Sequence, residues 1–186
     1  MNPSTQEIIS AFEDLPAEDV IILPNNKNIL LAAQQAVKIS DKNVTVVPSV
    51  SVPQGIAAMF AYEQNGGLKE VTENMTASLD DIQTVQITTA TRSVEIDEVQ
   101  VKEGQVIGLL ENHLVASGDN IADVLLDTLE KAQLEDVELI TLYYGQNYSE
   151  EEANRIVEVL QSKYGELEME VHAGGQPHYQ LILSLE

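Results

Sequence analysis

The first fifty residues alternate helical apolar stripes with short apolar runs. Apolar side chains recur at helical spacing from Ile8 to Leu15, and the uninterrupted apolar run 20–23 follows. An alanine-rich helical pattern over 30–39 and a second run at 44–47 come next. The pattern therefore predicts the order helix, strand, helix, strand.

The same order returns near the end of the chain. Apolar positions over 121–132 are spaced as in a helix, and 137–142 forms another apolar run. A helical pattern after Ser149 and a closing run at 167–171 complete the second copy. Strands that alternate with helices favour crossover connections, so the pattern predicts a duplicated unit with a mainly parallel sheet in each copy.

Two helix starts carry the same local signal. Ser4 and Glu7 have the spacing of a capping box, and so do Ser149 and Glu152. In this motif the serine and the glutamate satisfy each other's free backbone donors. A helix is therefore predicted to begin after each serine.

The middle of the chain has a different pattern. Residues 71–82 have a helical pattern, whereas 85–91, 94–96 and 99–101 alternate as half-buried strands do. The runs 106–110 and 113–116, joined by two residues, predict an antiparallel hairpin. The expected fold class is therefore α/β, with two similar α-β-α-β lobes joined by a β-rich, partly antiparallel insert, and with segment boundaries at 1–65, 66–118 and 119–186.

Composition narrows the classes of function. The 186 residues include 31 Asp and Glu against nine Lys and Arg, which gives a formal net charge of -22. Such a charge repels phosphate backbones and anionic lipids, which argues against nucleic-acid binding and membrane insertion. It provides solubility or, alternatively, a dedicated acidic face for a basic partner.

Two features that the sequence lacks, cysteine and a long apolar run, limit its possible chemistry and its expected cellular location. It has no cysteine, which excludes disulfides, thiolate zinc sites and a thiol nucleophile. The first residues show no basic region followed by an apolar stretch, and no apolar run is long enough to span a bilayer. A cytoplasmic location is expected.

Candidate catalytic groups do not form a recognisable set. Glu170, His172 and His178 lie close in sequence, but their spacing matches no strong metal-ligand signature, so no metal site is expected. No serine lies in a nucleophile-elbow pattern, and no Walker or dinucleotide glycine pattern is present. The sequence therefore indicates a segment without catalytic residues.

Several loops follow predicted strands, where α/β proteins often bind ligands. The segment 25–28 opens a helix, and Lys27 is suited to a phosphate, although asparagine is also a preferred helix cap. Ser49 and Ser51 lie between two prolines, in a ligand loop or in an ordinary extended connection. Gly174 and Gly175 form a ligand cradle or a simple turn.

Specific motifs carry a resemblance that spans essentially the whole chain. They are 1–5 (Met-Asn-Pro-Ser-Thr), 21–28 (Ile-Ile-Leu-Pro-Asn-Asn-Lys-Asn), 47–49 (Val-Pro-Ser), 52–55 (Val-Pro-Gln-Gly), 90–92 (Ala-Thr-Arg) and 174–177 (Gly-Gly-Gln-Pro). In content and order they resemble the C-terminal region of the ATP-binding subunits of bacterial fatty acid kinase, in the dihydroxyacetone-kinase-like family.

The resemblance implies a non-catalytic role for this segment. Family members bind ATP and magnesium on an N-terminal domain and phosphorylate the carboxylate of a fatty acid held by a separate fatty-acid-binding subunit. Their C-terminal region is implicated in docking that subunit, and the acyl phosphate feeds phospholipid synthesis. By this resemblance Met1 is an internal methionine, and no cofactor is expected on this segment.

The expected docking residues lie mainly in loops at the ends of strands. Arg92 is a further candidate that pairs bidentately with a partner carboxylate or, equally, forms an internal salt bridge. Two alternatives stay open: a domain that binds an acyl or phosphorylated ligand between the lobes through Lys27 and the glycine loop, and a structural module that forms homodimers. The loop candidates are Asn25, Asn26, Lys27, Asn28, Pro53, Gln54, Gly55, Gly174, Gly175, Gln176 and Pro177.

Overall fold

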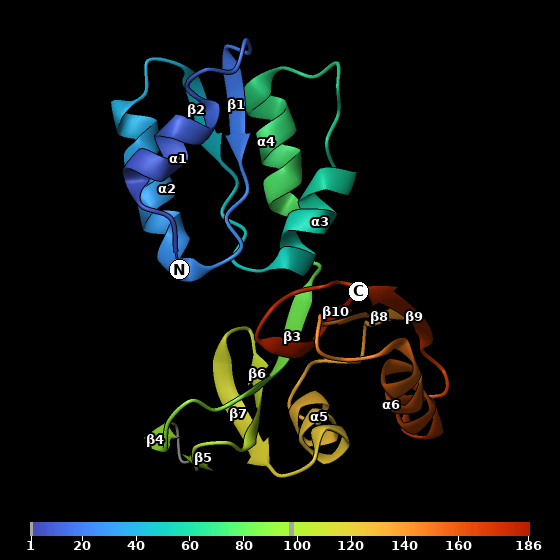
Figure 1. The fold of residues 1–186 in the computed structure, drawn as a ribbon. Helices are drawn as coiled ribbons and strands as arrows, with labels where there is room; N and C mark the ends of the chain where they lie inside the picture. Colours follow the sequence, from blue (N-terminus) through green and yellow to red (C-terminus); the bar gives the residue numbers. More distant parts are fainter. Residues whose placement is uncertain (1, 97–98) are drawn as a thin grey trace. The chain divides into compact units, whose positions relative to one another are not determined.

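A computed structural model describes residues 2–96 and 99–186 (Figure 1). The chain forms two compact units, which comprise Met1–Ile82 and Gln83–Glu186. No helix in the described part of the chain is both long and apolar enough to cross a membrane.

Unit 1, residues 1–82, has the order of elements predicted for the start of the chain. Strands β1 and β2 pair in parallel, with Val20 opposite Val44. Helices α1 and α2 lie on one side of this pair and α4 on the other (Figure 1). The elements are α1 Thr5–Phe12, β1 Asp19–Ile22, α2 Lys27–Ile39, β2 Asn43–Val46, α3 Val52–Phe60 and α4 Leu68–Ala77.

Two apolar clusters form the core of unit 1. Phe12, Ala36 and Val44 join α1 and α2 to β2. Val47 and Met75 belong to a second cluster, which packs α3 and α4 against the segments that follow the strands. The small sheet is thus enclosed by helices, while the loops after its strands are left at its carboxyl end.

Unit 2, residues 83–186, contains a six-stranded sheet in the order β7-β6-β3-β10-β8-β9 and a separate β4–β5 pair. Strands β8 and β9 pair in parallel, whereas the other neighbours in the large sheet pair antiparallel. The elements are β3 Gln83–Thr89, β4 Val94–Ile96, β5 Val99–Val101, β6 Val106–Leu110, β7 His113–Gly118, α5 Ile121–Leu129, β8 Leu139–Tyr144, α6 Glu150–Lys163, β9 Glu168–Ala173 and β10 Tyr179–Leu185.

The mixed sheet corrects two predictions. A mainly parallel sheet is wrong for unit 2, because its central strand β10 pairs antiparallel with both β3 and β8. The predicted β-rich insert is not a separate joining piece either, since β3, β6 and β7 share one sheet with β8, β9 and β10. Helix α4, from the same predicted segment, belongs to unit 1.

The predicted internal repeat is not confirmed. The order α5-β8-α6-β9 does match α1-β1-α2-β2, and both contain a parallel strand pair. However, β1 and β2 form a complete two-stranded sheet, whereas β8 and β9 form one edge of a six-stranded sheet. A shared element order is common among α/β folds and does not establish duplication.

The predicted hairpin at 106–116 is confirmed. Strands β6 and β7 pair antiparallel, and Glu111 and Asn112 connect them with φ angles of 50° and 64°. Two consecutive residues with positive φ are typical of the tight turns whose twist matches that of the flanking strands.

The large sheet presents two different faces. Helices α5 and α6 cover one face, where Leu125 and Leu160 pack with Val85 and Leu183 (Figure 1). Because successive side chains alternate between faces, Ile107 and Leu109 of β6 point to the other face. There they join Ala90, Val101 and Leu114 in a small cluster beside the β4–β5 pair.

Candidate functional site

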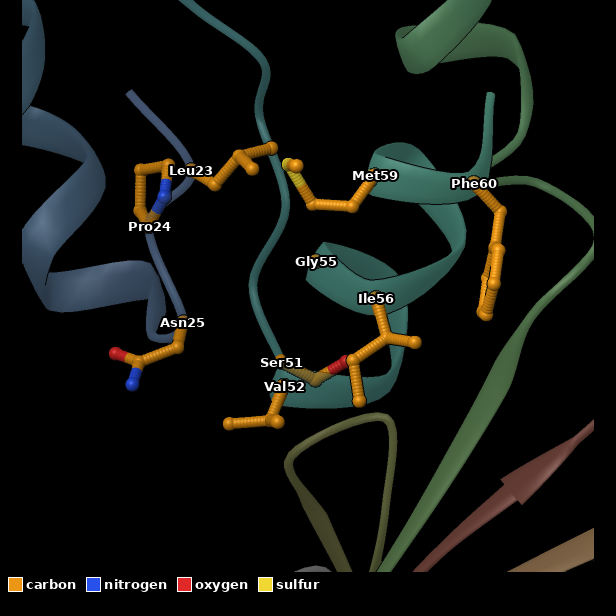
Figure 2. Close-up of a pocket in the computed structure, with 9 residues that line it drawn as sticks. All are labelled: Leu23, Pro24, Asn25, Ser51, Val52, Gly55, Ile56, Met59 and Phe60. Atoms are coloured by element: carbon orange, nitrogen blue, oxygen red, sulfur yellow. The ribbon is translucent and has the colours of Figure 1, made fainter. Parts of the chain in front are cut away.

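An open apolar pocket lies in unit 1, where β1 ends and α3 begins (Figure 2). We call it the α3 pocket, and its volume is about 390 Å³. The residues that line it are Leu23, Pro24, Asn25, Ser51, Val52, Gly55, Ile56, Met59 and Phe60. None of these described lining residues carries a charge.

The sequence of α3 places its apolar residues toward the pocket. Val52, Ile56 and Met59 are spaced by about one helical turn, which aligns them on one side of the helix. Gly55 lies between them without a side chain, and a Cβ there would meet nothing within 4 Å. The result is a shallow apolar surface rather than an enclosed cavity.

Several of these side chains are exposed to an unusual degree. Phe60 is 88% exposed, Met59 56% and Val52 43%. Contiguous exposed apolar side chains of this size often mark a surface that another molecule covers. The α3 pocket is therefore the strongest candidate site in unit 1.

Hydrogen bonds hold the two walls of the α3 pocket in place. The hydroxyl of buried Ser49 donates to the carbonyl of Pro24 at 2.6 Å, which ties the loop after β2 to the loop after β1. The Ser51 hydroxyl accepts from the Gln54 backbone N–H at 3.3 Å and caps α3. Both serine hydroxyls thus form hydrogen bonds that hold the extended connection between β2 and α3 in place.

The structure brings together part of the predicted site. Asn25 and Gly55, from two different predicted loops, line the same pocket. Asn26 instead caps α2 by accepting from the backbone N–H of Asn28 at 2.8 Å, and Lys27 is the first residue of that helix. The capping interpretation of the asparagine loop therefore holds for Asn26.

The other residues of the Pro-Gln-Gly segment support the loop from inside. Pro53 and Gln54 are both buried in α3. The side-chain oxygen of Gln54 accepts from the backbone N–H of Val50 at 2.9 Å. These two residues position the pocket wall, while Gly55 lies at its surface.

The segment Gly174–Pro177 lies in unit 2 and connects β9 to β10. The backbone N–H groups of Gly174 and Gly175 donate to the carbonyl of Tyr144 at 3.0 and 3.1 Å. The Gln176 side chain donates to the carbonyl of Tyr143 at 2.9 Å. These bonds fasten the segment to the end of β8, as expected of a structural turn.

Arg92 lies in unit 2 at a second pocket, which we call the hairpin pocket because β4 and β5 form one of its walls. Its volume is about 290 Å³. Within residues 2–96 and 99–186, Arg92 takes part in none of the ion pairs. The lining residues are Ala90, Thr91, Arg92, Val94, Ile96, Val101, Ile107, Leu109, Asn112, His113 and Leu114.

A small polar cluster lies on β8 and β9. His172 Nε2 and Glu170 Oε2 are 3.0 Å apart, and the rings of His172 and Tyr143 stack with centroids 5.9 Å apart. Burial raises the pKa of Tyr143. Among the described residues no group of three or more His, Cys, Asp or Glu side chains is placed to hold a metal ion.

Sequence reasoning missed most of the α3 pocket. The segment 52–60 is apolar on nearly all sides, so its periodicity does not reveal which side chains are buried and which are exposed. The one available signal is its position directly after a strand and loop, where ligand and partner sites are frequent.

A family model for the C-terminal domain of the A-like subunits of fatty acid kinase matches residues 1–186. An uncharacterized protein of Staphylococcus haemolyticus is 36% identical over all 186 residues, which make up 34% of that protein. An uncharacterized protein of Staphylococcus aureus (strain USA300) is 37% identical over the same residues, again 34% of its length. The chain therefore spans about a third of the length of these relatives.

Two kinds of solved structure share the fold. The Streptococcus pneumoniae fatty acid kinase B3 protein loaded with linoleic acid has a TM-score of 0.64 at 15% identity, covering 99% of this chain and 76% of that chain. The dihydroxyacetone kinase of C. freundii, in complex with AMP-PNP and Mg²⁺, also has a TM-score of 0.64, at 14% identity over 98% of this chain and 42% of that chain. At such identities the similarity concerns the fold alone.

Proposed function

The chain belongs to the family of C-terminal domains found in the A-like subunits of fatty acid kinase, and on that premise we propose that it docks a separate fatty-acid-binding subunit of the kinase. The single observation that carries this proposal is the exposed, uncharged apolar surface of α3. In this role the chain holds the partner and takes no part in the chemistry.

The remaining steps belong to the rest of the polypeptide. The chain corresponds to about a third of its relatives' length, which leaves room for a kinase domain elsewhere. We propose that ATP and Mg²⁺ bind there and that the carboxylate of the partner-bound fatty acid is phosphorylated to an acyl phosphate. Docking keeps the acyl-loaded partner within reach of that domain by raising its effective concentration.

The exposure of Phe60 favours a protein partner over a small ligand at the α3 pocket. At 88% exposure the ring lies at the edge of the pocket, so a small molecule seated within the pocket would leave much of the ring in water. Burying one large apolar side chain is worth about 1.5–3 kcal/mol. A partner that covers both the pocket and its rim gains this energy from Phe60 and from Met59 beside it.

Net charge supports the same partner class. With a formal charge of -22, the chain attracts a partner that presents basic side chains and repels an acidic one. Such attraction mainly accelerates association and is screened by salt. We therefore propose that added salt weakens docking chiefly by slowing association, while the apolar contacts at α3 persist.

Calorimetric titration of the chain with its cognate fatty-acid-binding subunit tests docking. Saturable one-to-one binding is the expected result, and a partner emptied of lipid should bind with similar affinity because the contacts are protein to protein. No binding at several hundred micromolar partner would contradict docking. Binding that requires lipid would favour direct contact with the acyl chain.

A second candidate function is binding of an acyl ligand by this chain itself. The observation that favours it is the shared fold with a protein whose solved structure is loaded with linoleic acid. A specific ligand stabilises the folded chain once its concentration exceeds the dissociation constant, so a rise in melting temperature with linoleic acid would support this alternative. A mass measurement in solution separately tests the homodimer alternative.

A further inference from the structure

The hairpin pocket of unit 2 has the chemistry of a binding site in its own right. Apolar side chains from four strands form its wall, namely Val94, Ile96, Val101, Ile107, Leu109 and Leu114. Polar side chains of Thr91, Arg92, Asn112 and His113 also line it. An apolar wall with a few polar groups is the usual composition of a small-molecule site.

The wall is built by specific hydrogen bonds. The Ser117 hydroxyl of β7 donates to the carbonyl of Gln100 in β5 at 2.8 Å. The Ser93 hydroxyl accepts from the backbone N–H of Glu103 at 3.0 Å, and the Ala90 N–H donates to the carbonyl of Gln105 at 2.8 Å. The first bond ties β5 to β7, and the other two join the two ends of the β4–β5 segment to each other at its base.

The described lining of this pocket differs in charge from the chain as a whole. The sequence has 31 acidic and nine basic residues, yet the described residues that line the pocket include Arg92 and His113 and no acid. Of the two arginines in the sequence, Arg155 pairs with Glu151 one turn away on α6 at 2.6 Å, whereas Arg92 lines the pocket. A guanidinium in such a place suits a carboxylate, which it binds with two parallel hydrogen bonds.

Volume limits how much of a ligand the pocket can bury. A water molecule occupies about 30 Å³ of liquid. A pocket of about 290 Å³ therefore holds on the order of ten non-hydrogen atoms. This is the size of a medium-chain carboxylic acid with its carboxylate, and it is too small to enclose a long-chain fatty acid.

We infer that the hairpin pocket binds a short aliphatic carboxylate of about the size of octanoate, with Arg92 contacting the carboxylate and the apolar wall contacting the chain. Most of the affinity comes from burying the chain, because Arg92 is exposed and exposed ion pairs contribute little. The site lies in unit 2 and does not depend on docking at the α3 pocket of unit 1.

Methyl NMR of the 186-residue chain titrated with octanoate tests this inference, with octanoate kept below its micelle concentration. The expected result is saturable shifts of the methyl groups of Val94, Ile96 and Leu114, with the Ile56 and Met59 methyls of the α3 pocket unchanged. No saturable shift in the hairpin pocket, or equal shifts in both pockets with the same midpoint, would overturn it.

Arginine variants distinguish a site that recognises the carboxylate from a pocket that binds any apolar chain. Arg92→Gln should weaken octanoate binding about three- to fivefold, as expected for an exposed ion pair, while leaving 1-octanol binding unchanged. Arg155→Gln removes the same charge from another exposed site and should change neither ligand. Equal octanoate affinity in wild type and Arg92→Gln would contradict the assignment, whatever the result of docking titrations.

Discussion

Unit 1 and unit 2 share a helix, strand, helix, strand order with a parallel strand pair, but they complete their sheets differently. In unit 1 the pair β1–β2 is the whole sheet, and the loop after β1 contributes to the apolar α3 pocket. In unit 2 the pair β8–β9 is extended by antiparallel strands. The β4–β5 pair forms the hairpin pocket together with β6 and β7, which lie at the opposite edge of the sheet from β9. The position of each pocket thus depends on the elements added to the shared helix, strand, helix, strand unit, which are α3 in unit 1 and the antiparallel strands in unit 2.

The two pockets also differ in polarity. The described lining of the α3 pocket is uncharged, and an exposed aromatic ring stands at its edge. The hairpin pocket contains an arginine and a histidine beside a similar apolar wall. Because neutral apolar surfaces suit protein contacts and a positioned arginine suits an anion, one chain offers two distinct recognition chemistries.

The largest expected difference between the units comes from one substitution made in each. A Cβ at Gly108 of β6 would lie 1.9 Å from the Thr128 hydroxyl, which is buried and hydrogen-bonded within α5. Gly108→Ala should therefore lower the free energy of unfolding by about 2–3 kcal/mol through overpacking. Gly55→Ala in α3 has open space and should raise it by about 0.5–1 kcal/mol.

Urea unfolding of both glycine variants measures these changes against wild type. Opposite signs would support the difference in packing between β6 and α3. A stable Gly108→Ala variant would mean that α5 does not pack closely against β6.

The next effect concerns docking through unit 1. Phe60→Ser should weaken binding of the fatty-acid-binding subunit by about 2 kcal/mol, or roughly thirtyfold, as expected for an exposed aromatic residue that the partner buries. Ile39→Ser is a matched control, because Ile39 is 67% exposed at the last residue of α2, about 18 Å along that helix from its first residue. Titration calorimetry of both variants compares them, and equal losses would remove α3 from the docking surface.

A smaller loss of stability should have the same size in the two units. Ser4 and Ser149 each cap a helix within a capping box. Replacing either serine with alanine should lower the free energy of unfolding by about 1 kcal/mol, because one backbone donor of the helix loses its partner. Thermal unfolding of the two variants measures both losses, and a loss of stability in only one variant would contradict this expectation.

The smallest effect is a change in the pKa of the glutamate at each of the same two caps. Hydrogen bonds from the side chain and then the backbone of Ser149 lower the pKa of Glu152. At Glu7 the backbone of Ser4 has the larger part in lowering the pKa, and the side chain the smaller. Ser149→Ala and Ser4→Ala should therefore each raise the pKa of the paired glutamate, and only in part, because the backbone bond survives substitution.

The sign of the pH dependence follows from these lowered values. A carboxylate whose folded pKa lies below its unfolded pKa stabilises the fold above the unfolded pKa, and the stabilisation is lost as pH falls through the folded pKa. NMR titration of the side-chain carboxyl groups of Glu7 and Glu152 in wild type and in both variants measures the shifts. An unchanged pKa at either glutamate in its serine variant would contradict the assigned causes.

Local patterns predicted much of the fold. The elements of the first fifty residues and the hairpin around Glu111 and Asn112 follow from apolar spacing and turn chemistry, which act over a few residues. The sheet of unit 2 was not predictable in this way. Its central pairing joins β3 to β10, strands that lie far apart in the sequence, and periodicity carries no information about such partners.

The candidate site was predicted only in part, because local patterns reveal some of its residues and not others. Asn25 and Gly55 were found because they lie in loops that follow strands, where binding residues gather. Phe60 was missed as a surface residue because an apolar residue in a short apolar helix is expected to be buried. Its exposure depends on how α3 packs against β1 and α4, which the sequence of α3 alone does not specify.

Hydrogen exchange of the chain with and without the fatty-acid-binding subunit tests the docking proposal most directly, because it locates the contact without altering a residue. Docking through α3 predicts slower exchange of the backbone amides of residues 52–60 when the partner is present. Binding that leaves α3 exchange unchanged and protects only unit 2 would contradict it.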